Sequence, residues 1–80
     1  MDSNQVLVGV KKVITQVLNI DPANIYEEAN FIFDLGADSM QSIALVAGFE
    51  QEFGIEMEED KALQVQTVND AVKFISEHLK

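Results

Sequence analysis

The sequence predicts an all-α fold: a four-helix bundle with three longer helices, one short helix and a long loop between the first two helices. Apolar residues recur at helical spacing in three segments, and capping residues precede those segments. No segment shows the apolar–polar alternation that is typical of a half-buried strand. With 80 residues, 48% of them hydrophobic, the chain is expected to form a single domain, 1–80, around one small core.

The first helix is expected over residues 3–18. Ser3 or Asn4 is a suitable N-cap, because either side chain can accept a hydrogen bond from a free backbone N–H. The β-branched residues lower the intrinsic helix propensity of this segment, so tertiary packing must hold the helix. Its predicted buried stripe consists of Val6, Val10, Val13 and Val17, widened by Leu7, Ile14 and Leu18.

The connection over residues 19–35 is long for a compact domain, and loops of this length are often functional. Asp21 followed by Pro22 predicts one short turn, because aspartate caps well and proline suits a first helical position. The apolar residues are too many for a free loop, so we expect the connection to lie on the core. They are Ile20, Ile25, Tyr26, Phe31, Ile32, Phe33 and Leu35.

The second helix is expected over residues 39–53 and should end at Gly54. Asp38 is a good N-cap, and Gln41 stands at the third helical position, as in a capping box. Gly48 lies inside this helix and costs about 1 kcal/mol relative to alanine. Close helix packing, a widened internal pocket and sequence drift are its open explanations. The predicted buried stripe consists of Ile43, Val46, Phe49 and Phe53, with Leu45 alongside.

The remaining helices are expected near the end of the chain. A short third helix is predicted over residues 60–65, and the last helix should follow a cap at Thr67. The predicted buried stripe of the last helix consists of Val68, Ala71, Val72, Ile75 and Leu79, flanked by Phe74.

Composition excludes several classes of function. The chain has no cysteine, so disulfides, thiolate metal sites and a cysteine nucleophile are excluded, and any thiol used in function must come from a cofactor. The net charge of −9 makes nucleic acid an unsuitable partner and would steer basic protein surfaces towards the chain. No apolar run approaches the roughly 20 residues that span a bilayer. We therefore expect a cytoplasmic monomer without membrane insertion.

Ser39 is the leading candidate for a functional residue. At the first position of a helix, its hydroxyl should point outward beside free backbone N–H groups and the positive end of the helix dipole. A phosphate ester on this oxygen would be well placed, and Gly36 permits the tight turn that presents it. An ordinary helix-start serine is the alternative on these grounds alone.

An enzyme is not expected. The nucleophile-elbow pattern fails around Ser39, because Ala37 and Gln41 stand where glycines are needed. The single histidine, His78, lies at the far end of the chain. The acids lack the spacing of a calcium-binding loop, so no metal site is predicted either.

Ser39 belongs to a longer motif that begins at Phe31 and continues as Asp34-Leu35-Gly36-Ala37-Asp38-Ser39-Met40. This motif resembles the phosphopantetheine attachment site of acyl carrier proteins, which have leucine where Met40 stands. The similarity continues through residues 50–56 and 67–72 and extends over nearly all 80 residues. Together the motifs favour a carrier over an ordinary helix start.

The resemblance implies that a phosphopantetheinyl transferase, a holo-acyl-carrier synthase, moves 4'-phosphopantetheine from coenzyme A to Ser39. Gly36, Asp38 and Met40 would be the flanking residues of the cofactor site. The arm's thiol would then carry acyl groups as thioesters between enzymes of fatty-acid biosynthesis or of a specialised lipid or polyketide pathway. An aminoacyl carrier of the D-alanyl type and an unmodified helical interaction module are the alternatives.

Two surfaces are also implied by the resemblance. Acyl-processing enzymes with basic docking surfaces would bind at Asp34, Asp38, Gln41, Ala44, Ala47, Glu50 and Glu52. The acyl chain, as cargo, would retreat into a space between helices lined by Val46, Phe49, Ala62 and Val65. Gln41 and Ala44 are neutral where fatty-acid carriers often have acids, which predicts a specialised carrier with a restricted set of partners.

Overall fold

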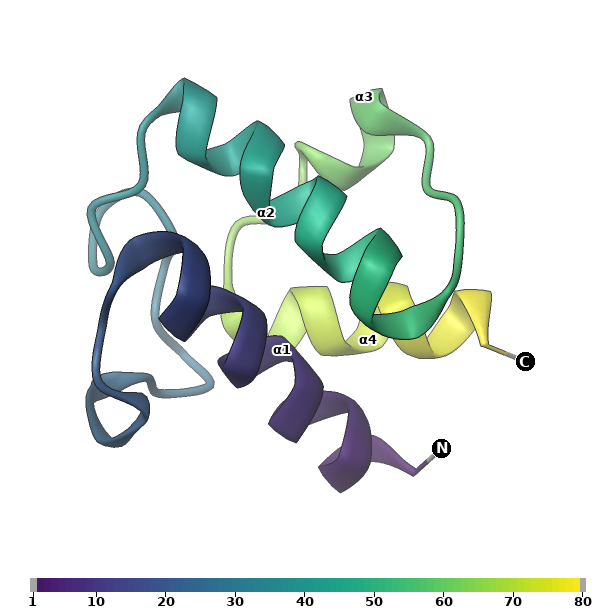
Figure 1. Ribbon diagram of the computed structural model, residues 1–80, viewed down its shortest axis with the longest axis horizontal. Helices are drawn as coiled ribbons and strands as arrows, with labels where there is room; N and C mark the ends of the chain where they lie inside the picture. The colour runs from purple at the N-terminus through teal and green to yellow at the C-terminus, as the bar shows by residue number, and fades with distance from the viewer. Residues whose placement is uncertain (1, 80) are drawn as a thin grey trace.

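The computed structural model describes residues 2–79, so the two ends of the predicted domain lie outside the described residues. Within them the chain forms four α-helices and one 3₁₀ turn (Figure 1). These elements are α1 (Ser3–Leu18), η1 (Pro22–Asn24), α2 (Ser39–Phe53), α3 (Glu59–Ala62) and α4 (Val68–His78). The part of the chain described contains no strand, only an isolated bridge between Asn30 and Thr67. The predicted all-α fold is confirmed.

The two longest helices have the predicted bounds, whereas the third is shorter than predicted. Residues 60–65 were expected to be helical, but α3 ends at Ala62. Gln64 N–H and Val65 N–H donate to carbonyls three residues back, those of Lys61 and Ala62, at 3.2 Å each. The chain therefore tightens into turns after one helical turn, because an i to i−3 bond ends the α-helical pattern.

The N-cap of α1 is Asp2, so the prediction of Ser3 or Asn4 is wrong. The Asp2 carboxylate accepts from Gln5 N–H at 2.9 Å, and Gln5 Oε1 accepts from Asp2 N–H at 3.0 Å. This reciprocal pair satisfies two backbone donors at once, which a serine one position later could not do. Ser3 and Asn4 become the first two helical residues.

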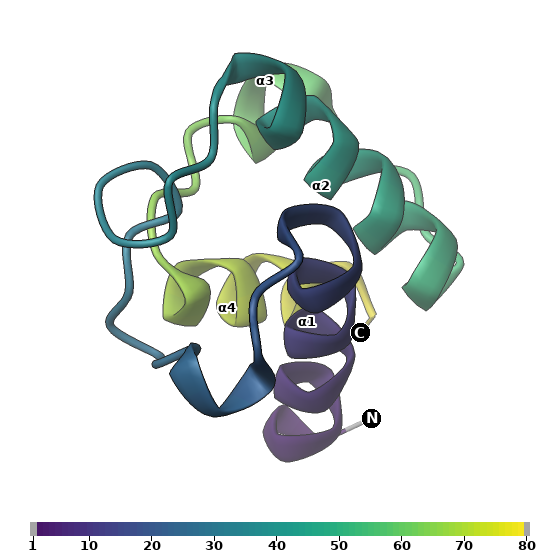
Figure 2. The ribbon, with the colours of Figure 1, turned by 60° about the vertical axis from the view of Figure 1, so that its left-hand side comes forward.

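α1 lies against both α2 and α4, as the two views in Figures 1 and 2 show. Its predicted stripe is confirmed: Val6, Val10 and Val13 are buried, and Val17 is half-buried. The connection and the other helices complete one apolar core. The core's buried residues outside α1 are Ile25, Ala29, Phe31, Ala37, Leu45, Phe49, Val68, Ala71, Val72 and Ile75. Ala62 of α3 is also buried.

Two glycines allow α1 and α2 to approach closely. A Cβ atom at Gly48 would lie 2.6 Å from Val13 Cγ1, and one at Gly9 would lie 2.6 Å from Phe53 Cζ. Real Cβ atoms do not come this close to another carbon, so a side chain at either position would force a neighbour to move. The neighbour of Gly48 is the buried Val13, whereas the neighbour of Gly9 is the far end of the Phe53 ring. Of the three explanations for Gly48, close helix packing is the one supported.

The buried face of α2 differs from the prediction at one position. Leu45 and Phe49 are buried and Val46 and Phe53 are half-buried, but Ile43 is 49% exposed. Ile43 lies two residues before Leu45, which is about 200° around the helix axis. Because Leu45 faces the core, Ile43 faces solvent.

The long connection lies on the core only in part. Ile25 and Phe31 are buried, and Ala29 is buried with them. The prediction is wrong for Tyr26, Ile32 and Phe33, which are 64%, 58% and 88% exposed. Backbone hydrogen bonds tie the connection to the start of α4: Val68 N–H donates to the Ala29 carbonyl at 3.0 Å, and Phe31 N–H donates to the Gln66 carbonyl at 2.9 Å. The connection is thus anchored to the start of α4 through Ala29 and Phe31.

Candidate functional site

Ser39 is exposed and is the first residue of α2. The Asp38 carboxylate accepts from Gln41 N–H at 2.7 Å, and Gln41 Oε1 accepts from Asp38 N–H at 3.1 Å, which confirms the predicted capping box. The N–H groups of Ser39 and Met40 precede the first intrahelical hydrogen bond. The Ser39 hydroxyl therefore stands beside outward-facing donors, at the positive end of α2.

The loop before α2, residues 30–37, is held by its own hydrogen bonds. Asn30 Oδ1 accepts from the N–H groups of Ile32, at 2.9 Å, and Phe33, at 3.0 Å. In return, Asp34 Oδ2 accepts from Asn30 N–H at 2.7 Å. The role of Asn30 was missed in the sequence, although asparagine followed by an apolar stretch is a known turn former.

The end of this loop turns sharply at Gly36, which has a φ of +75°. A residue with a side chain would be strained there. Ala37 N–H donates to the Phe31 carbonyl at 2.8 Å and Gly36 N–H to the Ile32 carbonyl at 3.1 Å. The turn and these bonds fix the direction in which the chain enters α2 and so fix the position of Ser39.

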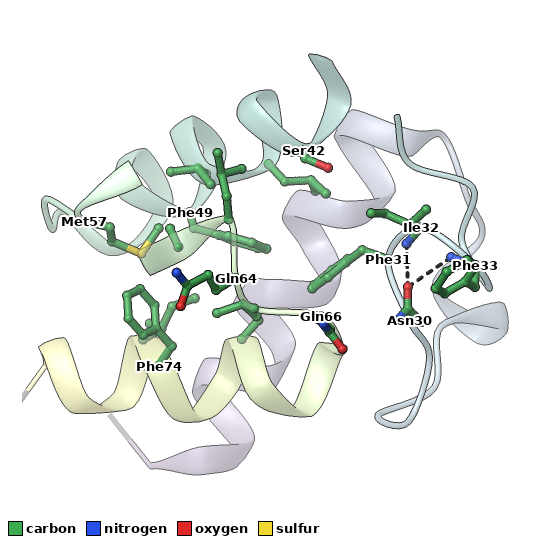
Figure 3. A pocket seen from close by; sticks show the side chains of 17 residues that line it. Asn30, Phe31, Ile32, Phe33, Ser42, Phe49, Met57, Gln64, Gln66 and Phe74 are labelled. Carbon is green, nitrogen blue, oxygen red and sulfur yellow. Dashed lines mark hydrogen bonds between the residues drawn. The ribbon is translucent and has the colours of Figure 1, made fainter. Parts of the chain in front are cut away.

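A cavity of about 380 Å³ lies under α2, bounded by α4, the segment after α3 and the loop before α2 (Figure 3). The four residues predicted to line a space between helices, Val46, Phe49, Ala62 and Val65, all line this cavity. Phe31 lines it too, with its ring centroid 6.5 Å from that of Phe49. The walls are mainly apolar.

The cavity runs along α2 from its first turns. Ser42 and Ile32 lie towards one end of it, and Met57 and Phe74 lie at the other (Figure 3). Ser42 follows Ser39 by three residues, so the two lie on the same side of α2. One end of the cavity is therefore next to the turn that bears Ser39. Sequence reasoning missed Phe74 as a wall residue, because its position depends on how α4 crosses beneath α2.

The four acids predicted for partner docking are Asp34, Asp38, Glu50 and Glu52. Each makes a contact within the chain. The contacts of Asp34 and Asp38 are described above. Glu50 Oε2 accepts from Met57 N–H at 3.0 Å and holds the segment after α2, while Glu52 Oε1 lies 3.5 Å from Lys12 Nζ of α1. Ala44 and Ala47, also predicted for docking, are exposed on α2.

His78 is not near Ser39. It lies at the last position of α4, and Figure 1 shows that end of the molecule away from the start of α2. His78 Nδ1 donates to the Phe74 carbonyl at 2.9 Å, and its ring lies 4.7 Å from the Phe74 ring. In the described structure, His78 is therefore not placed to act as a base for Ser39.

Residues 2–79 contain no cluster of three or more histidine, aspartate or glutamate side chains that could hold a metal ion. In the same range, every helix is too short or too polar to cross a membrane.

Residues 9–75 match the profile of a protein family described as "Phosphopantetheine attachment site". The chain is also similar to curated proteins of closely matching length. One is the acyl carrier protein of Phenylobacterium zucineum (strain HLK1), 50% identical over 76 residues, which are 95% of this chain and 96% of that protein. Another is the acyl carrier protein of Caulobacter vibrioides (strain NA1000 / CB15N), 49% identical over 74 residues, covering 92% and 95% of the two chains.

Proposed function

Because the chain belongs to the acyl carrier protein family, we propose that Ser39 is the residue that bears its 4'-phosphopantetheine arm. The observation that carries this assignment is the exposed hydroxyl at the first position of α2, next to one end of an apolar cavity. The protein is a carrier and not an enzyme. When bound, the arm supplies a thiol that holds acyl groups as thioesters.

The surroundings of Ser39 fit a phosphodiester. The N–H groups of Ser39 and Met40 can donate to phosphate oxygens, and the dipole of α2 favours negative charge at this end. The Asp38 carboxylate already accepts from Gln41 N–H, which directs it towards the helix end. Ser39 itself contributes only the oxygen that forms the new ester, and the transferase supplies the catalysis.

The cavity beneath α2 is the proposed shelter for the acyl chain. The end of the cavity next to the first turns of α2 lies towards an arm carried on Ser39. Val46, Phe49, Ala62 and Val65 would cover the methylene groups, and burying each of them would contribute about 0.8 kcal/mol. The volume of about 380 Å³ fits a chain of moderate length.

The partners of this carrier are proposed to be a phosphopantetheinyl transferase and acyl-processing enzymes with basic surfaces. The net charge of −9 supports steering of such surfaces towards the chain. We place the carrier in the cytoplasm, in fatty-acid biosynthesis or in a specialised lipid or polyketide pathway. The neutral Gln41 and Ala44 support a restricted set of partners.

The assignment of Ser39 is tested by intact mass after incubation with coenzyme A and a phosphopantetheinyl transferase. The wild type should gain one phosphopantetheine, and Ser39→Ala should gain none. Ser42→Ala is the matched control, because it removes a serine hydroxyl one turn later and should still be loaded. Loading of Ser39→Ala, or no loading of the wild type when a known carrier is loaded, would overturn the assignment and favour an unmodified interaction module.

A further inference from the structure

The end of the cavity away from Ser39 is formed by Met57 and Phe74, which we call the end wall. Both side chains line the cavity and are half-buried, and Figure 3 shows them at the opposite end from Ser42. Met57 belongs to the segment between α2 and α3, and Phe74 belongs to α4. An acyl chain that lies in the cavity with its thioester towards Ser39 therefore has its methyl end at the end wall.

Phe74 is held in place by His78, which follows it by four residues in α4. The two rings pack against each other, with their centroids 4.7 Å apart and their planes tilted by 59°. His78 Nδ1 also lies 2.9 Å from the Phe74 carbonyl oxygen, so the imidazole is itself fixed to the helix. Because a tilted pair of aromatic rings is a favourable contact, an acyl chain that displaced the Phe74 ring would have to break it.

Met57 is held in place by Glu50 of α2. The Glu50 carbonyl accepts from Gly54 N–H and, at 3.1 Å, from Ile55 N–H. The Glu50 carboxylate accepts from Met57 N–H at 3.0 Å, in a partly buried hydrogen bond. Three backbone donors of the segment after α2 thus converge on one residue. Loss of the carboxylate would leave Met57 N–H without this acceptor, so the backbone that carries the Met57 side chain would be free to shift.

We propose that the end wall sets the longest acyl chain that this carrier shelters, and that Glu50 is the positioning residue of Met57. The inference rests on the proposed function, because it needs an acyl chain that is carried on Ser39 and lies in the cavity. Each methylene group that leaves water for the cavity stabilises the protein. A chain that has reached the end wall gains no more from added methylene groups, because a packed wall yields to extra atoms only with strain. Glu50, expected from the sequence to bind partners, thus acts on the cargo.

The test measures the melting temperature of holo-proteins that carry saturated acyl chains of increasing length, from butyryl to palmitoyl, each checked by intact mass. In the wild type, the gain in melting temperature over the unacylated holo-protein should grow with chain length and then stop at a limit. In Phe74→Ala this limit should move to chains longer by about two carbon atoms or more, because the removed ring leaves space at the end wall. Phe74→Leu should shift the limit less in the same direction, and it replaces Phe74→Ala if that variant does not fold.

The role of Glu50 is tested with three further variants in the same assay. Glu50→Ala should move the limit to longer chains, because Met57 can then yield. Glu50→Gln loses the charge but keeps an acceptor oxygen, so it should retain the wild-type limit. Glu52→Ala is the matched control on α2, since the Glu52 carboxylate lies 3.5 Å from Lys12 Nζ of α1, and it should leave the limit unchanged.

The possible failures are distinguishable. The same limit in the wild type and in both Phe74 variants would overturn the inference while leaving the attachment of the arm to Ser39 standing. A limit in Glu50→Ala that equals that of Glu52→Ala, or equals that of Glu50→Gln, would overturn the positioning role of Glu50. A loaded wild type whose melting temperature does not change with any acyl chain would overturn the shelter under α2 and this inference together. A wild type that is not loaded at all would overturn the proposed function.

Discussion

Asp38 caps α2 and directly precedes Ser39, the proposed attachment residue. The chain offers an internal comparison, because Asp2 makes the same capping box at the start of α1. Both boxes follow the order Asp, Ser, any residue, Gln. The box at Asp38 was predicted from this pattern, and the same pattern would have identified Asp2 as the cap of α1.

Asp38→Ala and Asp2→Ala should therefore each lower the free energy of unfolding by about 1 kcal/mol, through the lost cap. Only Asp38→Ala should slow phosphopantetheine loading, because only that carboxylate lies beside Ser39, the proposed attachment residue. Urea unfolding checks the loss of stability, and intact mass measured over time checks the rate of loading. Identical loading rates for the two variants would show that Asp38 acts only as a cap.

Asp34 was predicted to bind partners, but its carboxylate also holds the loop before α2 through Asn30 N–H. Asp34→Ala should lower the free energy of unfolding by about 1 kcal/mol, because the N–H loses a charged acceptor. Asp34→Asn keeps an acceptor oxygen, so its free energy of unfolding should fall by less. Urea unfolding measures the free energy of unfolding of both variants. Equal decreases for the two would mean that the hydrogen bond to the Asp34 oxygen contributes little stability.

The helices show which structural features can be predicted locally. Caps and apolar spacing act within a few residues, so the bounds of α1 and α2 follow from the sequence. The exposure of Ile43 cannot be predicted locally, because it depends on which side of α2 packs against α1. The same holds for Phe74, which reaches the cavity only through the placement of α4.

The close contact of α1 with α2 makes Gly48 a sensitive position. Gly48→Ala adds a methyl group 2.6 Å from Cγ1 of the buried Val13, and we expect a net loss of about 1–3 kcal/mol despite better helix propensity. Gly9→Ala should cost less, because the atoms it meets are at the end of the half-buried Phe53 ring, which can shift. Urea unfolding measures the free energy of unfolding of both variants. A Gly48→Ala protein more stable than the wild type would contradict the close packing of α1 against α2.

At the scale of the whole molecule, the charge of −9 opposes the compact state through self-repulsion. The melting temperature should therefore rise as sodium chloride increases from about 0.05 to 0.5 M, since salt screens repulsion between exposed carboxylates. Glu56→Gln removes one charge from the acids at 56–60 and should reduce this response. A melting temperature that does not depend on salt would show that the acids are too far apart to interact.

The carrier account as a whole depends on an acyl chain that is attached through Ser39 and lies in the cavity under α2. The most direct measurement is a set of nuclear Overhauser effects between an isotope-labelled acyl group on the holo-protein and the protein's own protons. We predict contacts from the acyl chain to Val46, Phe49, Ala62 and Val65, with none in Ser39→Ala treated in the same way. A loaded wild type whose acyl chain shows no contact with these four residues would contradict the account.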